Sequence, residues 1–182
     1  WGGAGNDRIV GGDGYDVLYG EGGADEVWGG YGQDLVYLGD GNDVFTDDAL
    51  SGTHGVDTVF AGNGNDRIKG GGGNDVFRGE GGHDEIWGGA GNDRIVGGDG
   101  YDVLYGEGGA DLFIFAFEHG SDRIADFTSG EDLIQFNIAG LSFADLQFVV
   151  DASDVLIETE SGDIRLVGVV PCELTPEDFL FL

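Results

Sequence analysis

Residues 88–105 read GGAGNDRIVGGDGYDVLY and decide the fold of this chain. They contain two copies of a nine-residue unit. Each unit has six glycine-rich residues ending in aspartate, followed by three residues rich in β-branched and aromatic side chains. Glycine permits tight turns, and β-branched and aromatic residues favour strands. Each unit therefore predicts a tight loop followed by a short strand.

The unit recurs twelve times between residues 2 and 114. Its aspartate returns every nine residues from Asp7 to Asp43 and, after a five-residue insertion at 47–51, from Asp57 to Asp111. The fourth position is always glycine, and the eighth, two residues after the aspartate, is always large and apolar. Because strand side chains alternate, the eighth is expected to point inward. The sequence predicts an all-β protein in which two units form one turn of a right-handed parallel β-roll.

Stacked turns would bring aspartates 18 residues apart close together. Such carboxylates repel one another unless a cation lies between them. Hard oxygen ligands without a His/Cys set favour Ca²⁺ over zinc or copper, and a need for six or more oxygens favours it over Mg²⁺. A salt-adapted surface would instead scatter its acidic residues, whereas 12 of the 17 aspartates in residues 1–111 occupy one register position. Calcium binding is therefore predicted.

Composition excludes several partners. The chain has 36 acidic and 7 basic residues, a formal net charge of −29, and one lysine, Lys69. This balance argues against nucleic acid and anionic membranes, and no apolar run is long enough for a membrane span. Cys172 is the single cysteine, so an internal disulfide is excluded. Trp1 stands where Trp28 and Trp87 stand in their units, so we expect a C-terminal piece of a longer protein without a Sec-type leader.

The loops resemble the nonapeptide GGxGxDxUx of the RTX, or haemolysin-type calcium-binding, family over Gly2–Ile114. The resemblance implies that each ion is held by two loops on one edge. The earlier loop supplies the carbonyls of its second and fourth positions and its aspartate. The loop two units later supplies the carbonyls of its first and third positions and its aspartate. Glu21, Glu80 and Leu38 stand where other units have glycine, but they would bind through their carbonyls and remain ligands.

About eight calcium sites are implied. They are Gly3, Gly5 and Asp7 with Gly20, Gly22 and Asp25; Gly12, Gly14 and Asp16 with Gly29, Tyr31 and Asp34; Glu21, Gly23 and Asp25 with Leu38, Asp40 and Asp43; Thr53, Gly55 and Asp57 with Gly70, Gly72 and Asp75; Gly62, Gly64 and Asp66 with Gly79, Gly81 and Asp84; Gly71, Gly73 and Asp75 with Gly88, Ala90 and Asp93; Glu80, Gly82 and Asp84 with Gly97, Asp99 and Asp102; and Gly89, Gly91 and Asp93 with Gly106, Gly108 and Asp111. The insertion is expected to interrupt pairing between units four and six and between units five and seven.

Residues 115–182 are expected to form a small antiparallel β cap that covers the last apolar layer of the roll. Its strands, together with the end of the roll, are predicted at 112–117, 122–127, 132–138, 145–150, 154–159 and 163–170. The stretch GSDRIADFTSGEDLIQF at 120–136 resembles the segment after the roll in serralysin-type proteases and mannuronan C5-epimerase modules. Asp122, Asp126 and Asp132 are candidates for a terminal calcium site there.

The last residues indicate how the chain is used. Thr175 before Pro176 is typical of a helix N-cap. Residues 177–182 are two acidic residues followed by an apolar cluster, and they resemble the uncleaved signals of type I secretion substrates. The expected partners are thus a type I secretion apparatus and an upstream passenger domain. We expect a secreted module that stays unfolded at cytosolic calcium and folds at millimolar calcium outside the cell.

No catalytic residues are predicted, so any enzyme activity is expected to lie upstream. His54, His83 and His119 lack catalytic motifs around them, and Cys172 has no activating neighbour. Two other functions remain open, an accessory module of a secreted enzyme of the alginate epimerase or serralysin type and a spacer in an adhesin. Carbohydrate binding would use outward aromatics, for which the candidates are Tyr19, Trp28, Tyr37, Trp87 and Tyr105. These residues are equally compatible with a simple role on a sheet face.

Overall fold

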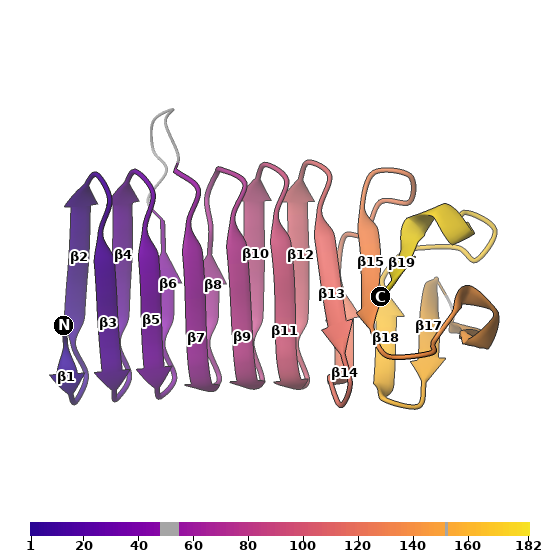
Figure 1. Ribbon diagram of the computed structural model, residues 1–182, viewed down its shortest axis with the longest axis horizontal. Helices are drawn as coiled ribbons and strands as arrows, with labels where there is room; N and C mark the ends of the chain where they lie inside the picture. The colour runs from indigo at the N-terminus through magenta and orange to yellow at the C-terminus, as the bar shows by residue number, and fades with distance from the viewer. Residues whose placement is uncertain (48–54, 152) are drawn as a thin grey trace.

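The computed structural model describes residues 1–47, 55–151 and 153–182, which fold into two long β-sheets and two short 3₁₀ helices. Through the repeats, consecutive strands alternate between the sheets (Figure 1). In spatial order, the first sheet contains β1 (Gly3–Ala4), β3 (Val17–Gly22), β5 (Leu35–Asp40), β7 (Thr58–Gly64), β9 (Val76–Gly82), β11 (Arg94–Gly100), β13 (Leu112–Ala116), β15 (Leu133–Asn137) and β19 (Phe179–Phe181). The second contains β2 (Arg8–Asp13), β4 (Glu26–Tyr31), β6 (Val44–Thr46), β8 (Arg67–Lys69), β10 (Glu85–Ala90), β12 (Val103–Gly108), β14 (Gly120–Ile124), β18 (Gly162–Leu166), β17 (Asp154–Thr159) and β16 (Gln147–Asp151). The predicted all-β parallel roll is confirmed.

Neighbouring strands of the repeats are parallel and lie one turn apart. Ile86 pairs with Leu104, 18 residues later. Across the insertion, Val36 pairs with Val59, so the separation grows to 23 residues while the eighth positions still face each other. The expectation that the insertion interrupts pairing is therefore wrong. Register is fixed by the inward side chains, and the additional residues do not shift these.

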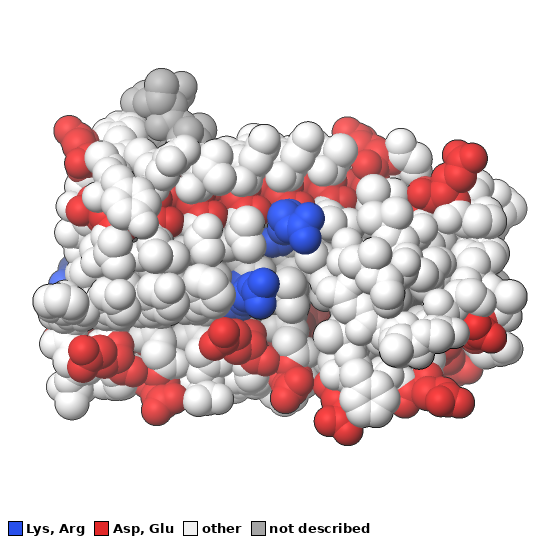
Figure 2. All heavy atoms as spheres, in the orientation of Figure 1, with Lys and Arg blue, Asp and Glu red and all other residues white. Residues whose placement is uncertain are grey.

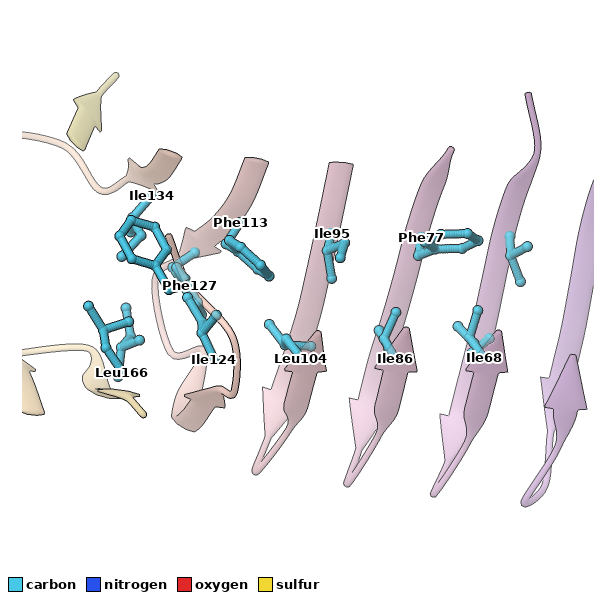
Figure 3. Packing of buried hydrophobic residues seen from close by; sticks show 14 of the residues in the cluster. Ile68, Phe77, Ile86, Ile95, Leu104, Phe113, Ile124, Phe127, Ile134 and Leu166 are labelled. Carbon is cyan, nitrogen blue, oxygen red and sulfur yellow. The ribbon is translucent and has the colours of Figure 1, made fainter. Parts of the chain in front are cut away.

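The core consists of two facing rows of eighth-position side chains. Ile68, Ile86 and Leu104 point inward from the second sheet towards Phe77 and Ile95 on the first (Figure 3). All five are fully buried. Burying such a side chain contributes about 1.5–3 kcal/mol, so the rows hold the two sheets together.

Two segments of identical sequence lie on opposite sheets. Residues 1–25 and 87–111 are the same letter for letter. The residues that form β2 in the second sheet recur in β11 of the first, and those of β3 in the first recur in β12 of the second. One unit sequence therefore builds either sheet.

The predicted cap is only partly antiparallel. The segments expected at 112–117, 122–127 and 132–138 form β13, β14 and β15, which extend both sheets as parallel strands. Among the described strands, antiparallel pairing is confined to β16–β17 and β17–β18, and β18 also pairs in parallel with β14. Apolar runs do not reveal strand direction, whereas stacking on the roll imposes it. The expected boundary after residue 114 falls inside two continuous sheets, and the division into two folding units stays a prediction.

The two helices lie in the C-terminal part. They are η1 (Phe143–Asp145) and η2 (Pro176–Asp178). The Thr175 hydroxyl accepts the Glu177 N–H, which confirms the predicted N-cap. No helix in the described parts of the chain is long and apolar enough to cross a bilayer.

Candidate metal sites on the two edges of the roll

The loops between strands stack along two edges. On the first edge, loops lead into second-sheet strands; on the second edge, they lead into first-sheet strands. Acidic side chains line both long edges of the face in Figure 2, and basic side chains lie between them. The edges are therefore where negative charge is concentrated.

The register aspartates form a hydrogen-bonded ladder along each edge. The backbone N–H of each aspartate donates to Oδ1 of the aspartate one turn later, with N···O distances of 2.7–3.0 Å. The first edge carries Asp7, Asp25, Asp43, Asp66, Asp84, Asp102 and Asp122, and the second carries Asp16, Asp34, Asp57, Asp75, Asp93, Asp111 and Asp132.

The second carboxylate oxygen is the exceptional feature. Among the described residues, eleven register aspartates have a buried Oδ2 without a hydrogen-bond partner. Leaving one buried polar atom unpaired costs about 1–3 kcal/mol, and more for a charged group. A repeated cost of this kind indicates a ligand that all the loops share. The eleven are Asp7, Asp16, Asp25, Asp34, Asp43, Asp57, Asp66, Asp75, Asp84, Asp93 and Asp102.

Carbonyl oxygens of the earlier loop point forward across each gap. Between loops 11–16 and 29–34, the Gly12 carbonyl points at Gly30 so closely that a Cβ there would collide with it. The Gly14 carbonyl points at the fourth-position glycine of loop 29–34 in the same way. Loop glycines are therefore required here partly because oxygens crowd into the gap.

Oxygens of the later loop point back into the same gap. The Gly29 carbonyl is directed at Gly11 of the earlier loop. Asp16 Oδ2, which belongs to that earlier loop, lies 2.9 Å from the place a Cβ on Gly11 would take. Tyr31 O accepts a backbone N–H of the earlier loop at 2.6 Å, and Asp34 Oδ1 accepts the Asp16 N–H at 2.9 Å. The structure thus brings the predicted ligand set of this site together at one gap.

The donor set fits a hard cation. Among the described residues, no group of three or more His, Cys, Asp or Glu side chains is placed to hold a metal. The gap between loops 11–16 and 29–34 instead offers two carboxylates and several backbone carbonyls. Many oxygens without nitrogen or sulfur suit calcium, and they do not suit zinc or copper.

Burial opposes ionisation of these carboxyls when no cation is bound. It raises the pKa of Asp57, Asp66, Asp75 and Asp111 to about 7 and that of Asp102 to about 8. Backbone hydrogen bonds oppose this rise, and neighbouring carboxylates add to it. The edges therefore hold either protons or cations near neutral pH.

The insertion leaves the ladder intact. Asp34 N–H donates to Asp57 Oδ1 and Asp43 N–H to Asp66 Oδ1, both at 2.8 Å. The two pairs omitted from the eight implied sites thus have the same contact as the others. Thr53, a predicted carbonyl ligand, lies outside the described residues, as do residues 48–51 of the insertion and His54.

Two further loops were missed by the sequence reasoning. FEHGSD at 117–122 and FTSGED at 127–132 carry glycine and aspartate at the fourth and sixth positions, and their aspartates extend the two ladders. Insertions of two residues and one residue hid their phase. The signal was Gly-x-Asp followed two residues later by a buried apolar side chain, here Ile124 and Ile134.

The structure divides the proposed terminal triad and brings the number of aspartate pairs to twelve. Asp122 and Asp132 lie on different edges. Asp126 instead accepts the N–H groups of Gly106 and Glu107. Each edge therefore has six gaps with a register aspartate on both sides.

Four glutamates occupy strained loop positions. Glu21, Glu80, Glu107 and Glu118 all stand at the second position, with φ between 63° and 77°. A residue with a Cβ pays about 1–2 kcal/mol in this region, whereas glycine does not. Glutamate in place of glycine at this position is therefore tolerated with some backbone strain, and the carbonyl stays in place.

Glu80→Gly is expected to stabilise the calcium-loaded chain by about 0.5–1 kcal/mol. Removal of the strain outweighs the greater entropy of glycine in the unfolded chain. Thermal unfolding at saturating calcium measures this. Glu85→Gly, in strand β10, is the control and should destabilise by a similar amount. Equal effects of the two changes would contradict the assignment of strain.

The family model of the RTX calcium-binding nonapeptide repeat matches four times, over residues 1–35, 16–45, 51–86 and 87–116. No curated protein matches the chain.

Solved structures share the fold. The extracellular lipase LipA of Serratia marcescens is 23% identical, with a TM-score of 0.52, over 98% of this chain and 38% of the lipase. This chain thus spans well under half of the lipase.

Two subunits of the mannuronan C5-epimerase of Azotobacter vinelandii are also similar. AlgE6R3 is 22% identical, with a TM-score of 0.36, over 91% of this chain and 78% of its own. AlgE6R2 is 24% identical, with a TM-score of 0.30, over 96% and 92%. With matched repeats over more than half of its length, the chain belongs to the RTX calcium-binding nonapeptide-repeat family.

Proposed function

We propose that this chain is a calcium-dependent folding module that also carries the type I secretion signal of a larger secreted protein. The observation that carries the proposal is the row of unpaired, buried Oδ2 atoms on both edges. The carboxylates and carbonyls of each gap would hold one ion. Bound calcium would supply the positive charge that lets stacked carboxylates remain ionised at short range.

The fold and the charge oppose each other without cations. The chain has a net charge of −29, and its register aspartates lie in two ladders with protein on most sides. Metal binding and folding are then coupled, because the gaps exist only in the folded chain. Extracellular calcium modules bind at about 10⁻⁴–10⁻³ M, which would keep the chain unfolded at cytosolic calcium and folded outside.

Far-UV circular dichroism during a calcium titration tests this coupling. We expect a coil-to-strand transition between sub-millimolar and millimolar calcium, and no transition with magnesium at the same concentrations. A chain rich in strands in excess chelator at neutral pH would overturn the folding switch. A constitutive scaffold would then be the better interpretation.

The terminal segment supports export before folding. Strand β19 pairs with β15, and Phe179 is buried. The Asp178 carboxylate is also buried and accepts the Gly130 N–H at 2.8 Å. Glu177, Leu180 and Leu182 are exposed, so folding would hide Asp178 and Phe179 but not the whole of residues 177–182 from a secretion apparatus.

Deletion of residues 177–182 is expected to abolish export of the full chain by a type I apparatus. The measurement is the amount of chain in the culture medium relative to the cells. The Cys172→Ser variant, changed at an exposed residue outside the segment, is the control and should be exported normally. Undiminished export of the deletion variant would place the signal elsewhere.

The aromatic candidates for carbohydrate binding contact one another along the sheets. Tyr19 stacks on Tyr37 with centroids 5.2 Å apart, and Trp87 stacks on Tyr105 at 5.3 Å. The Arg8 guanidinium covers Trp28 at 4.6 Å. Ring faces used in this way are not free to stack on sugars, so the arrangement favours stabilisation of the sheets over a polysaccharide groove.

A further inference from the structure

The ladder on the first edge ends in an aspartate unlike those before it. Asp122 Oδ1 accepts the Asp102 N–H at 3.0 Å, as in every other step. Its Oδ2, however, lies 2.9 Å from Nδ1 of His119 and shares a hydrogen bond with it. The oxygen that is unpaired in the six preceding aspartates of this edge is thus occupied by a protein group.

The gap beyond Asp122 continues the geometry of the edge without a second carboxylate. Strand β14 pairs with β18, so Gly120 faces Gly162 and Asp122 faces Ile164. The Gly120 carbonyl points at Gly162, as fourth-position carbonyls do in the other gaps. The next turn therefore offers an apolar side chain where a register aspartate would be.

The imidazole lies inside this gap. His119 Cε1 is 2.9 Å from the place a Cβ on Gly162 would take, so the ring reaches the facing turn. The side chain is 3% exposed and meets the ring of Phe115 edge-on, with centroids 5.0 Å apart. The ring thus bridges the last repeat loop and β18, where calcium would lie between two ordinary loops.

We propose that His119 replaces calcium in the last gap of the first edge and joins the roll to its C-terminal strands without metal. The ring fills the space and satisfies the one carboxylate through Nδ1, so no carboxylate oxygen of Asp122 is left for an ion, while His119 Nε2 is buried without a hydrogen-bond partner among the described residues. The inference rests on the proposed calcium sites of the preceding gaps, because it concerns the gap that follows the last of them on the first edge.

The first test uses the wild-type chain. Long-range ¹H–¹⁵N NMR of the calcium-saturated protein should show the His119 ring in slow exchange with solvent, with Nδ1 hydrogen-bonded. His83, whose ring is exposed and accepts the Tyr101 N–H through Nδ1, is the internal reference. A His119 ring that exchanges freely or loses its bond at saturating calcium would overturn the proposal.

The second test converts the gap filled by the His119 ring into one like the preceding gaps. The double variant His119→Gly/Ile164→Asp removes the ring and adds the missing register carboxylate. We expect it to bind one more calcium per chain than wild type in equilibrium dialysis. His83→Asn, which installs the residue that Asn65 and Asn92 show at the same loop position, should leave the count unchanged.

The outcomes separate this inference from the proposed function. A wild-type chain that binds no calcium, or is folded in chelator, overturns the function. A wild-type chain that folds with calcium while the double variant gains no ion overturns only the role of His119. The NMR arm decides the case in which the double variant does not fold.

Discussion

In excess chelator, the chain is expected to be unfolded at about pH 7.5 and to regain strand structure as the pH falls to about 5. Protons would then replace calcium on the edge carboxyls. Because burial raises the pKa of Asp57 and Asp75 from 3.8 to about 7, both bind protons more tightly in the folded chain than in the unfolded one.

The sign follows from proton uptake. Between the ordinary pKa of 3.8 and the raised value near 7, the folded state binds more protons, so the free energy of unfolding decreases as pH rises. A shift of three pKa units corresponds to roughly 4 kcal/mol for one carboxyl. The same effect acts at several carboxyls along both ladders, and each lowers the free energy of unfolding at neutral pH. The metal-free fold is thus not expected to persist at neutral pH.

Circular dichroism in chelator across this pH range measures the effect. The matching titration with calcium should show the opposite trend, with tighter binding at higher pH because calcium and protons compete for the same carboxylates. Strand content that is high at neutral pH and unchanged by acid would contradict the assigned cost of buried carboxylates.

Asp75→Asn is expected to lower stability at saturating calcium about twice as much as Asp7→Asn. Asp75 lies in the middle of its ladder and contributes to the gaps on both sides, whereas Asp7 begins its ladder and contributes to one. At about 10 mM calcium, a site of 10⁻⁴–10⁻³ M contributes roughly 1.5–3 kcal/mol. The expected losses are thus about 3–5 kcal/mol for Asp75→Asn and about 1.5–3 kcal/mol for Asp7→Asn.

Asp99→Asn is the matched control because it removes the same charge from an exposed carboxylate outside the register and keeps the Asp99 backbone carbonyl, which is the group predicted to bind calcium. It should leave both the calcium midpoint and the thermal transition nearly unchanged. A calcium titration of the three variants gives the midpoints, and thermal unfolding gives the stabilities. Equal midpoints for Asp75→Asn and Asp99→Asn would show that register position does not matter.

Most of the roll could be predicted because each unit repeats both its apolar and its acidic position. The spacing of Asp7 and Asp25 alone placed them one turn apart, and the structure joins them by a hydrogen bond. The prediction failed where the nine-residue phase of the repeat was broken. Asp122 and Asp132 continue the ladders, but insertions displaced them from the nine-residue count.

Other features depend on contacts that a periodic pattern does not encode. The direction of β13 and β15 is set by stacking on the roll, which composition does not report. The partner of His119 is a carboxylate three residues away, inside a loop that the repeat count excluded. The sequence therefore showed only a histidine without a motif, whereas the structure places His119 at the end of the row of gaps on the first edge.

The placement of one sequence on both sheets gives the roll an approximate twofold screw axis. The natural unit of change is then nine residues and half a turn. Gain or loss of one unit would move every later loop to the opposite edge and still keep inward side chains inward. The length of such a roll can thus vary in steps of half a turn. Each step places everything that follows the roll on the opposite side relative to what precedes it.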